Sequence, residues 1–269
     1  MSCKIRYEDV SFTYADGTRA LRRVSFVIGH GERVALLGPN GAGKSTIMLL
    51  SNGILMPQEG SIMIGSLKLS PKTLVPIRQR VGLVFQDPDD QLFMTTVFDD
   101  VAFGLLNQGI KPDDGLKERV ADALQTVGLE HLARKAPQDL SFGQKKRAAL
   151  ATILAMRPDF LILDEPSSNL DPRGRRHMIK LLQEMEHTVL LATHDLDMVW
   201  ETCPRSIIID EGLIVADGPT RELLRDEQLL EAHGLELPAA ARCPAAAARC
   251  PAAATWCPAA AARCPAAAT

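Results

Sequence analysis

The sequence predicts an α/β fold in which a parallel sheet is covered by helices on both sides. Apolar runs at 159–166 and 188–195 have the length and composition of buried strands, and apolar residues at helical spacing occupy 173–186 between them. Alternation of buried strands with helices is typical of a parallel sheet with both faces covered. Between 87 and 156, successive helical patterns interrupt this alternation, which predicts a separate helical subdomain.

The other elements follow from the same two patterns. Polar and β-prone residues mix at 4–14 as they do in an edge strand, and 24–39 reads as two strands around a turn at Gly31-Glu32. Further strands are expected at 60–65 and 80–86, with a hairpin at 205–218 that turns at Glu211-Gly212. Helices are expected at 43–53, 97–106, 116–127, 141–156 and 173–186.

Composition argues against two classes of protein. A net charge of -3 over 269 residues gives no basic footprint for duplex nucleic acid. No apolar run approaches the roughly 18 residues that a membrane-spanning helix needs, and no apolar segment follows a basic flank at the N-terminus. We therefore expect a soluble, intracellular protein without a nucleic-acid partner, which could still sit on a membrane by docking to another subunit.

Residues 238–269 differ in composition from the rest of the chain. The cysteines of this tail, Cys243, Cys250, Cys257 and Cys264, recur at even spacing among Ala, Pro and Arg. Proline interrupts helices, and the tail lacks bulky apolar residues for a core. We expect 1–237 to form the folded domain and 238–269 a flexible appendix, with an evenly spaced metal-binding or disulfide array as the alternative.

The segment GPNGAGKST (38–46), called the phosphate loop below, follows a buried strand and opens a helix. Glycines let backbone N–H groups converge on phosphate oxygens, Lys44 reaches the terminal phosphates, and Ser45 can ligate magnesium. A glycine-rich turn without a ligand is the structural alternative. The complete pattern in this context favours phosphate binding.

Two acids end the apolar run FLILDEP (160–166). At the carboxyl edge of the sheet, where ligands bind, Asp164 would hold magnesium and Glu165 could polarise the attacking water. Two solvated acids are the alternative, which the phosphate loop disfavours. His194, after its own buried strand, could face the γ-phosphate, and Gln86 at the end of 80–86 could reach magnesium or water, although a structural role for either stays open.

The segment LSFGQKKR (140–147) contains a second candidate for phosphate binding. Ser141 followed by Gln144 has the form of a capping box, which predicts a helix start. Helix starts attract anions, and the cations that follow reinforce this. A satisfied capping box is the local alternative, and both interpretations can hold together.

The order of these motifs resembles that of the ATPase subunits of ABC transporters, over about residues 3–235. The phosphate loop, Gln86, LSFGQ (140–144), LILDE (161–165), SNLD (168–171) and His194 follow one another as in that family. The resemblance implies a P-loop NTPase fold with a parallel-sheet core, an N-terminal antiparallel β part and a helical subdomain at about 87–156. It also implies a homodimer in which the phosphate loop of one chain and the LSFGQ helix of the other form each ATP site, which explains the second candidate.

The same resemblance implies a role for each site residue. ATP would be bound by Tyr14 (stacked on adenine), Gly38, Pro39, Asn40, Gly41, Ala42, Gly43, Lys44, Ser45, Thr46 and, across the dimer, Ser141, Gly143 and Gln144. Catalysis would involve Glu165, His194, Gln86 and Lys44. Mg²⁺ would be bound by Ser45, Gln86 and Asp164, and Asp171 would lie at the dimer interface. The family's signature has two glycines, and Phe142 replaces the first of them here. We expect activity to survive, with Phe142 filling a contact beside the site, because Gly143 is kept.

Two stretches resemble the ATPases of energy-coupling importers, VFQDPDDQLF (84–93) and TVFDDVAFG (96–104). The ATPases of cobalt importers, of the CbiO type, are the closest match, with nickel as a related cargo, and vitamin importers have very similar ATPases. This implies transmembrane transporter subunits as partners, docked in a groove at about Asp87–Phe98, and a peripheral place on the cytoplasmic face of the inner membrane. Soluble ABC proteins of ribosomes or DNA and fused export ATPases are the rival classes; one cassette without a long heptad run favours transport.

Overall fold

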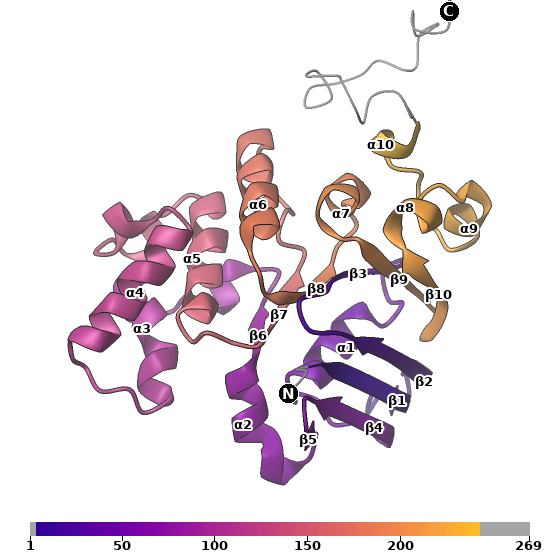
Figure 1. Cartoon of the computed structure of the whole chain (residues 1–269), viewed down its shortest axis with the longest axis horizontal. Helices are drawn as coiled ribbons and strands as arrows, with labels where there is room; N and C mark the ends of the chain where they lie inside the picture. Colours follow the sequence, from indigo (N-terminus) through magenta and orange to yellow (C-terminus); the bar gives the residue numbers. More distant parts are fainter. Residues whose placement is uncertain (1–3, 243–269) are drawn as a thin grey trace, which may run out of the picture.

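The computed structural model describes residues 4–242 and arranges them in two sheets and a helical subdomain (Figure 1). The larger sheet has the order β10-β9-β3-β8-β7-β6. Its strands are β3 (Arg33–Leu37), β6 (Val81–Val84), β7 (Phe160–Asp164), β8 (Thr188–Ala192), β9 (Arg205–Asp210) and β10 (Leu213–Pro219). All of its pairings are parallel except that of β9 with β10. The predicted parallel-sheet core is confirmed.

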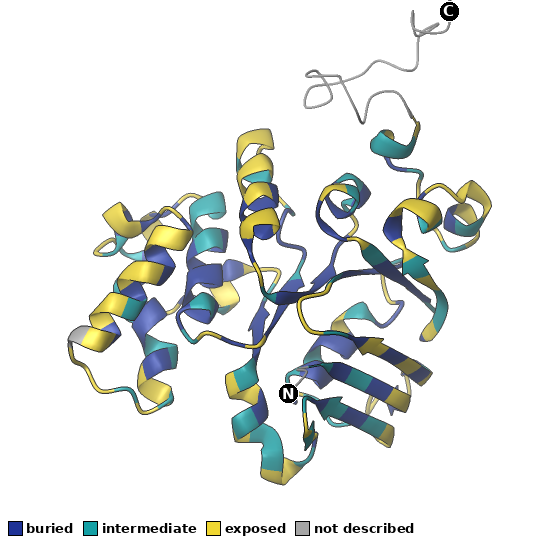
Figure 2. Ribbon diagram, viewed as in Figure 1, coloured by how far each residue is buried: buried dark blue, intermediate teal, exposed yellow. Residues whose placement is uncertain are grey.

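Strands of the larger sheet are apolar along their length because both of its faces are covered. Every residue of β6 and β8 is buried. On one face, Ile47 of α1 (Lys44–Ser51) packs in the same cluster as Leu36 of β3. On the other, Leu182 of α6 (Pro172–Glu184) shares a cluster with Leu163 of β7. Figure 2 shows the buried residues running through the centre of this sheet and along the inner sides of the helices.

The smaller sheet is antiparallel, in the order β2-β1-β4-β5. It consists of β1 (Ile5–Thr13), β2 (Arg19–Ile28), β4 (Glu59–Ile64) and β5 (Leu67–Lys68). The prediction that 4–14 is an edge strand was wrong, because β1 lies between β2 and β4, and β2 begins earlier than residue 24. Alternation along β1 reflects its two faces: the Tyr7 hydroxyl is buried and donates to the Ile47 carbonyl of α1 at 2.8 Å. Such alternation reports which face is covered and says nothing about which strands lie alongside.

The helical subdomain lies beside the larger sheet on the side of β6 (Figure 1). It contains α3 (Val97–Asn107), α4 (Asp114–Thr126) and α5 (Phe142–Leu154), close to the predicted ranges. Side-chain caps fix the starts of α3 and α4, where Thr96 accepts from the Asp99 N–H and Asp113 from the Leu116 N–H. Its apolar interior is continuous with one face of the larger sheet, so the subdomain is held by a shared core.

Five short helices were not predicted from the sequence. They are α2 (Leu74–Arg80), α7 (Leu196–Thr202), α8 (Thr220–Leu223), α9 (Glu227–Ala232) and α10 (Ala239–Arg242). Each is too short to show a helical period; α2 buries only Ile77. The last of them, α10, lies at the start of the segment 238–269 that was expected to be flexible. Its Ala240 N–H donates to the Asp197 carboxylate of α7 at 3.0 Å, so this start is bound to the domain. The repeated cysteines of the tail lie outside the described residues.

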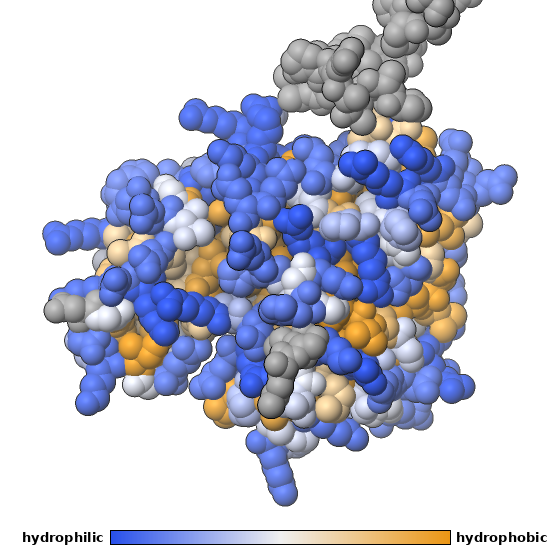
Figure 3. Space-filling model, viewed as in Figure 1, coloured by the Kyte–Doolittle hydropathy of each residue, from blue (hydrophilic) through white to orange (hydrophobic). Residues whose placement is uncertain are grey.

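Within residues 4–242, no helix has the length and apolar character needed to cross a membrane. The face of the molecule seen in Figure 3 is mostly hydrophilic, with apolar residues gathered in patches. Among the described large apolar side chains, Val75 of α2 is the most exposed at 70%, followed by Phe93, in the loop before α3, at 63%. Exposed apolar surface is therefore found where α2 and the helical subdomain begin.

Candidate active site

The phosphate loop connects β3 to α1, and two of its glycines are required by its backbone. Gly38 has φ +149°, and a Cβ there would lie 2.0 Å from the Ile209 carbonyl oxygen. Gly43 has φ +112°, and a Cβ there would lie 2.7 Å from the Ala20 carbonyl oxygen. Any larger residue would therefore displace the loop from the strands beneath it.

The start of α1 is arranged to receive an anion. No side chain caps this helix and no acid occupies its first turn, so its first N–H groups stay available, unlike those of α3 and α4. Lys44 reaches back over the loop, where its Nζ donates to the carbonyl oxygens of Gly38 (2.7 Å) and Pro39 (2.9 Å). Burial lowers the pKa of Lys44, while the carboxylates of Glu165 and Asp164 oppose that shift.

Asp164 ends β7 near this lysine, as expected from the strand order. Burial and the neighbouring charge of Glu165 raise the Asp164 pKa to about 6, against the influence of Lys44 and Lys146. An acid in this situation is stabilised in its charged form by any further cation nearby. Two carboxylates and two amines thus share one partly dehydrated region at the carboxyl edge of the sheet.

Both the backbone and the side chain of Glu165 are held by hydrogen bonds. Its backbone is left-handed, with φ +46°, and its N–H donates to the Ala192 carbonyl at 2.8 Å. One carboxylate oxygen, Oε2, accepts from the Thr193 hydroxyl at 2.9 Å, and the other, Oε1, lies 2.9 Å from Nδ1 of His194. The His194 side chain itself is 74% exposed. The carboxylate is therefore oriented by the end of β8, and His194 extends from it toward solvent.

Gln86 and Asp164 line one cavity of about 330 Å³, together with Phe142. Gln86 lies beyond the end of β6 at Val84, so the expectation that it ends the strand was wrong. The predicted magnesium ligands Ser45, Gln86 and Asp164 carry hydroxyl, amide and carboxylate oxygens, the donor types that Mg²⁺ accepts. The raised pKa of Asp164 agrees with this, because a cation bound nearby would stabilise the charged form of the acid.

The start of α5 has the predicted capping box. The Ser141 N–H donates to the Gln144 side chain at 2.9 Å, and the Gln144 N–H donates to the Ser141 hydroxyl at 3.4 Å. A Cβ on Gly143 would lie 3.3 Å from a methyl group of Leu170, next to Asp171, which caps α6 and is exposed. Within residues 4–242, no hydrogen bond joins Ser141, Gly143 or Asp171 to the phosphate loop. The two phosphate-binding candidates are separate in one chain.

Residues 21–168 match the family model described as ABC transporter. The chain belongs to the ABC transporter ATP-binding family. A Geobacter sulfurreducens protein named as an ABC transporter ATP-binding protein is 51% identical over 241 residues, which cover 89% of this chain and 96% of that protein. The energy-coupling factor transporter ATP-binding protein EcfA of Methanothermobacter thermautotrophicus is 44% identical over 242 residues, 88% of this chain and 78% of EcfA.

Among solved structures, this ABC ATPase is similar to CbiO1 of Clostridium perfringens, described as part of the ABC transporter complex cbiONQ. The TM-score is 0.76 at 41% identity, covering 85% of this chain and 93% of CbiO1. The predicted P-loop NTPase fold and ATPase activity are thereby confirmed: the protein binds and hydrolyses ATP.

Three groups in this ABC ATPase site were missed in the sequence. Thr193 orients Glu165, and Lys146 donates to the Glu165 carbonyl. Asp195 accepts two bonds from Arg175 of α6, from Nε at 2.6 Å and from Nη2 at 2.7 Å. A signal existed for Lys146, because it occupies the apolar stripe of α5 with Ala149, Leu150 and Ile153. Thr193 and Asp195 gave no such signal, since their partners are distant in sequence.

Tyr14 is predicted to stack on adenine, and its position allows this. It follows β1, is 37% exposed, and its hydroxyl lies 3.0 Å from that of Thr46 in the phosphate loop. We expect Tyr14→Ala to raise the KM for ATP more than it lowers kcat, because stacking stabilises ground and transition states alike. Steady-state kinetics with ATP test this. Tyr14→Phe is the matched control, since it keeps the ring and should keep the wild-type KM; an unchanged KM in Tyr14→Ala would contradict the stacking role.

Proposed function

We propose that this protein is the ATPase subunit of an energy-coupling ABC importer that drives uptake of a transition metal, cobalt or nickel, through a membrane partner. An energy-coupling importer of a vitamin is the alternative. Support comes from the relation to EcfA and CbiO1 and from the resemblance to cobalt-importer ATPases. The observations that carry the proposal are the charge interaction of Lys44 in the phosphate loop with Glu165 and an apolar groove lined by α2 and α3. Its place is then the cytoplasmic face of the inner membrane.

Hydrolysis follows from the side chains around the phosphate loop. Lys44 and the first N–H groups of α1 would bind the β- and γ-phosphates and stabilise the charge that develops on them. Glu165 would accept a proton from the water that attacks the γ-phosphorus, as the bond to the β-γ bridging oxygen breaks. His194, bonded to Glu165, would lie beside the γ-phosphate. Mg²⁺, held by Ser45, Gln86 and Asp164, would supply further neutralisation of the phosphate charge.

The dimer explains why one chain has two phosphate-binding candidates. In the proposed homodimer, Ser141 and the Gly143 N–H of one chain contact the nucleotide on the phosphate loop of its partner, with Gln144 behind them and Asp171 at the interface. The exposure of Ser141 and Asp171, and their separation from the phosphate loop of their own chain, support this arrangement. The capping box keeps the helix start formed until the partner arrives.

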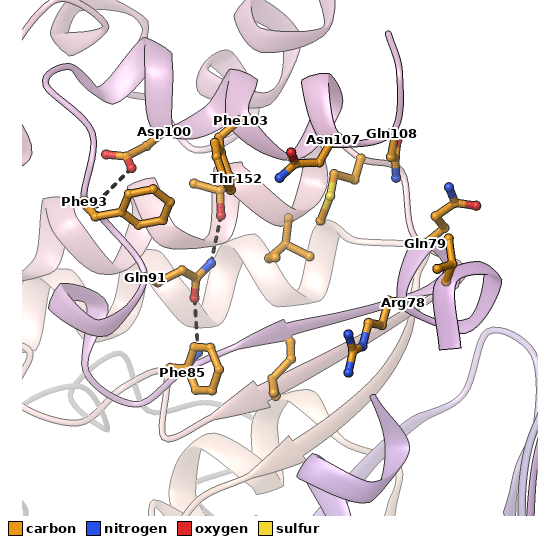
Figure 4. A pocket seen from close by; sticks show the side chains of 15 residues that line it. Arg78, Gln79, Phe85, Gln91, Phe93, Asp100, Phe103, Asn107, Gln108 and Thr152 are labelled. Atoms are coloured by element: carbon orange, nitrogen blue, oxygen red, sulfur yellow. Dashed lines mark hydrogen bonds between the residues drawn. The ribbon is translucent and has the colours of Figure 1, made fainter. Parts of the chain in front are cut away.

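A cavity of about 510 Å³ between α2, β6, α3 and α5, called the α2–α3 groove below, is the proposed docking site for the membrane subunit (Figure 4). Phe93 lines it and packs edge-on to Phe103, with ring centroids 5.0 Å apart. Of the stretch predicted from the sequence, Leu92 belongs to the buried core and Phe98 packs against that core. Of that stretch, Gln91 and Phe93 line the groove, which extends toward α2, whereas Asp87 and Asp90 line the cavity of Gln86 and Asp164.

Asp100 is a buried acid in the lining of the α2–α3 groove, which also contains Arg78. It is 3% exposed, and its Oδ1 accepts from the Phe93 and Met94 N–H groups, each at 3.0 Å. Its Oδ2 has no hydrogen-bond partner within the described residues, and burial raises the pKa of the acid. A buried carboxylate oxygen without a partner is costly. An amphipathic helix with an apolar face would cover Phe93, which is 63% exposed.

Phe93→Asp is expected to uncouple transport from hydrolysis. The change places a charge where an apolar helix face would dock. The groove contains no residue of the phosphate loop, so ATP binding should persist while uptake of cobalt or nickel is lost. Uptake of radiolabelled metal by cells that carry only the variant measures this, together with ATPase activity of the purified protein. Leu213→Asp is the matched control, because Leu213 is an exposed apolar residue (44%) of β10, outside the groove.

The result also separates the two substrates. Normal metal uptake with Phe93→Asp would contradict the docking site. Uptake of a labelled vitamin by wild-type cells, lost in Phe93→Asp and independent of metal, would support the docking site and contradict the metal substrate. Failure of the purified protein to retain membrane subunits would favour the rival class of soluble ABC ATPases.

A further inference from the structure

Lys146 of α5 is enclosed in the protein at a junction of three segments. It is 4% exposed, and its Nζ donates to the Ser168 hydroxyl oxygen at 2.7 Å and to the backbone carbonyl of Glu165. The Ser168 hydroxyl donates to the same carbonyl at 2.8 Å. The helix that starts at Ser141, the end of β7 and the turn before α6 therefore meet at one backbone oxygen.

Stability alone gives no reason for a lysine at this position. Burial lowers the Lys146 pKa to about 8, although the carboxylates of Glu165, Asp164 and Asp87 favour its charged form. Replacing a buried charge by an apolar side chain of similar size is often neutral or stabilising. The carbonyl of Glu165 would keep its other donors, the Ser168 hydroxyl and the Ser168 N–H at 3.1 Å. Loss of the amine would leave no unsatisfied carbonyl there.

What the amine does is restrain the backbone of Glu165. A glutamate with φ +46° is in an uncommon conformation that the surroundings must maintain. Its N–H donates to the carbonyl of Ala192 in β8, and its own carbonyl accepts from Lys146. Rotation of either peptide group would swing the carboxylate away from Thr193 and His194. Lys146 and the two Ser168 donors thus hold the backbone from which the carboxylate reaches Thr193 and His194.

We propose that Lys146 is a positioning residue for ATP hydrolysis, which aims the Glu165 carboxylate by holding the Glu165 carbonyl. The proposal rests on the proposed role of Glu165 as the base. It also connects two ATP sites: α5 presents Ser141 and Gly143 to the nucleotide of the partner, while Lys146, one helical turn further along, restrains the base for the nucleotide of its own chain. A shift of α5 when the dimer closes would be transmitted directly to Glu165.

The test uses the purified full-length protein and three measurements: steady-state kcat and KM, equilibrium binding of ATP, and the thermal midpoint. In Lys146→Met, kcat should fall by about tenfold or more, since small misplacements of a reacting group are costly. ATP affinity and the thermal midpoint should not fall. Lys146→Arg should recover most of the rate, because the guanidinium can donate to both oxygen acceptors. Lys180→Met is the control with wild-type kcat: Lys180 lies on α6, outside both phosphate-binding segments, and its side chain is 74% exposed.

A merely structural role for Lys146 predicts a different pattern. Parallel losses of kcat, ATP affinity and thermal midpoint in Lys146→Met would overturn the proposal, as would a rate in Lys146→Arg no better than in Lys146→Met. Ser168→Ala removes the second side-chain donor to the same carbonyl, so the effects of Ser168→Ala and Lys146→Met on kcat should not be additive; full additivity would count against a shared carbonyl.

Glu165→Gln separates this proposal from the one on which it rests. A wild-type kcat in Glu165→Gln would contradict the proposed base. A wild-type kcat in Lys146→Met, beside an inactive Glu165→Gln, would contradict only the role of Lys146.

Discussion

Glu165→Gln is expected to lower kcat for ATP hydrolysis by about 10²–10⁴-fold, the contribution of a positioned general base. The amide is nearly isosteric with the carboxylate, so it can still meet the Thr193 hydroxyl and His194, but it cannot accept the proton of the attacking water. ATP binding should persist because the phosphate loop is untouched. The variant should therefore accumulate as an ATP-bound dimer, measured by single-turnover hydrolysis and by the elution volume with and without ATP.

Thr193→Val is the matched control for this experiment. It removes the hydroxyl that orients Oε2 of Glu165 at 2.9 Å but leaves the carboxylate in place. Its kcat should fall less than that of Glu165→Gln, because the carboxylate base is still present and only its orientation is less fixed. Turnover near the wild-type rate in Glu165→Gln would show that another group accepts the proton.

Lys44→Ala is expected to abolish hydrolysis, with a loss in kcat/KM of at least about 10²-fold. Lys44 is the cation of the phosphate loop itself. Its Nζ donates to the carbonyls of Gly38 and Pro39, and it would stabilise the charge on the transferred phosphoryl group. The loss should include ATP affinity, unlike that of Glu165→Gln, because ground-state phosphates also carry charge. Phosphate release assays and ATP titrations measure the two effects.

A second lysine provides the control for Lys44→Ala. Lys180 lies on α6 with its side chain 74% exposed, paired only loosely with Glu184 at 3.7 Å, and Lys180→Ala should hydrolyse ATP as the wild type does. Substantial hydrolysis by Lys44→Ala, with Lys180→Ala normal, would remove the phosphate loop from the catalytic site.

The sequence determined the features of this protein that depend on neighbouring residues. The phosphate loop could be recognised in the sequence because consecutive residues specify it. Glycines occupy positions with positive φ, and an uncapped helix follows with Lys44 in its first turn. The capping box at Ser141 is equally local. The proximity of Asp164 to Lys44 was predictable indirectly, because parallel strands place their carboxyl ends on one edge of a sheet. The order of the motifs then indicated the family, which the comparisons confirmed.

Only the tertiary structure decided which residues meet across the chain. Alternation in β1 could not reveal that strands pair on both sides of it. The apolar residues Leu92, Phe93 and Phe98 could not be divided between core and groove before the packing was known. Lys146 lies on the apolar stripe of α5, yet only the packed fold shows that its amine lies against the backbone of Glu165. The physical reason is the same in each case: burial and hydrogen bonding at these positions come from segments distant in sequence, and their arrangement is a property of the packed core as a whole.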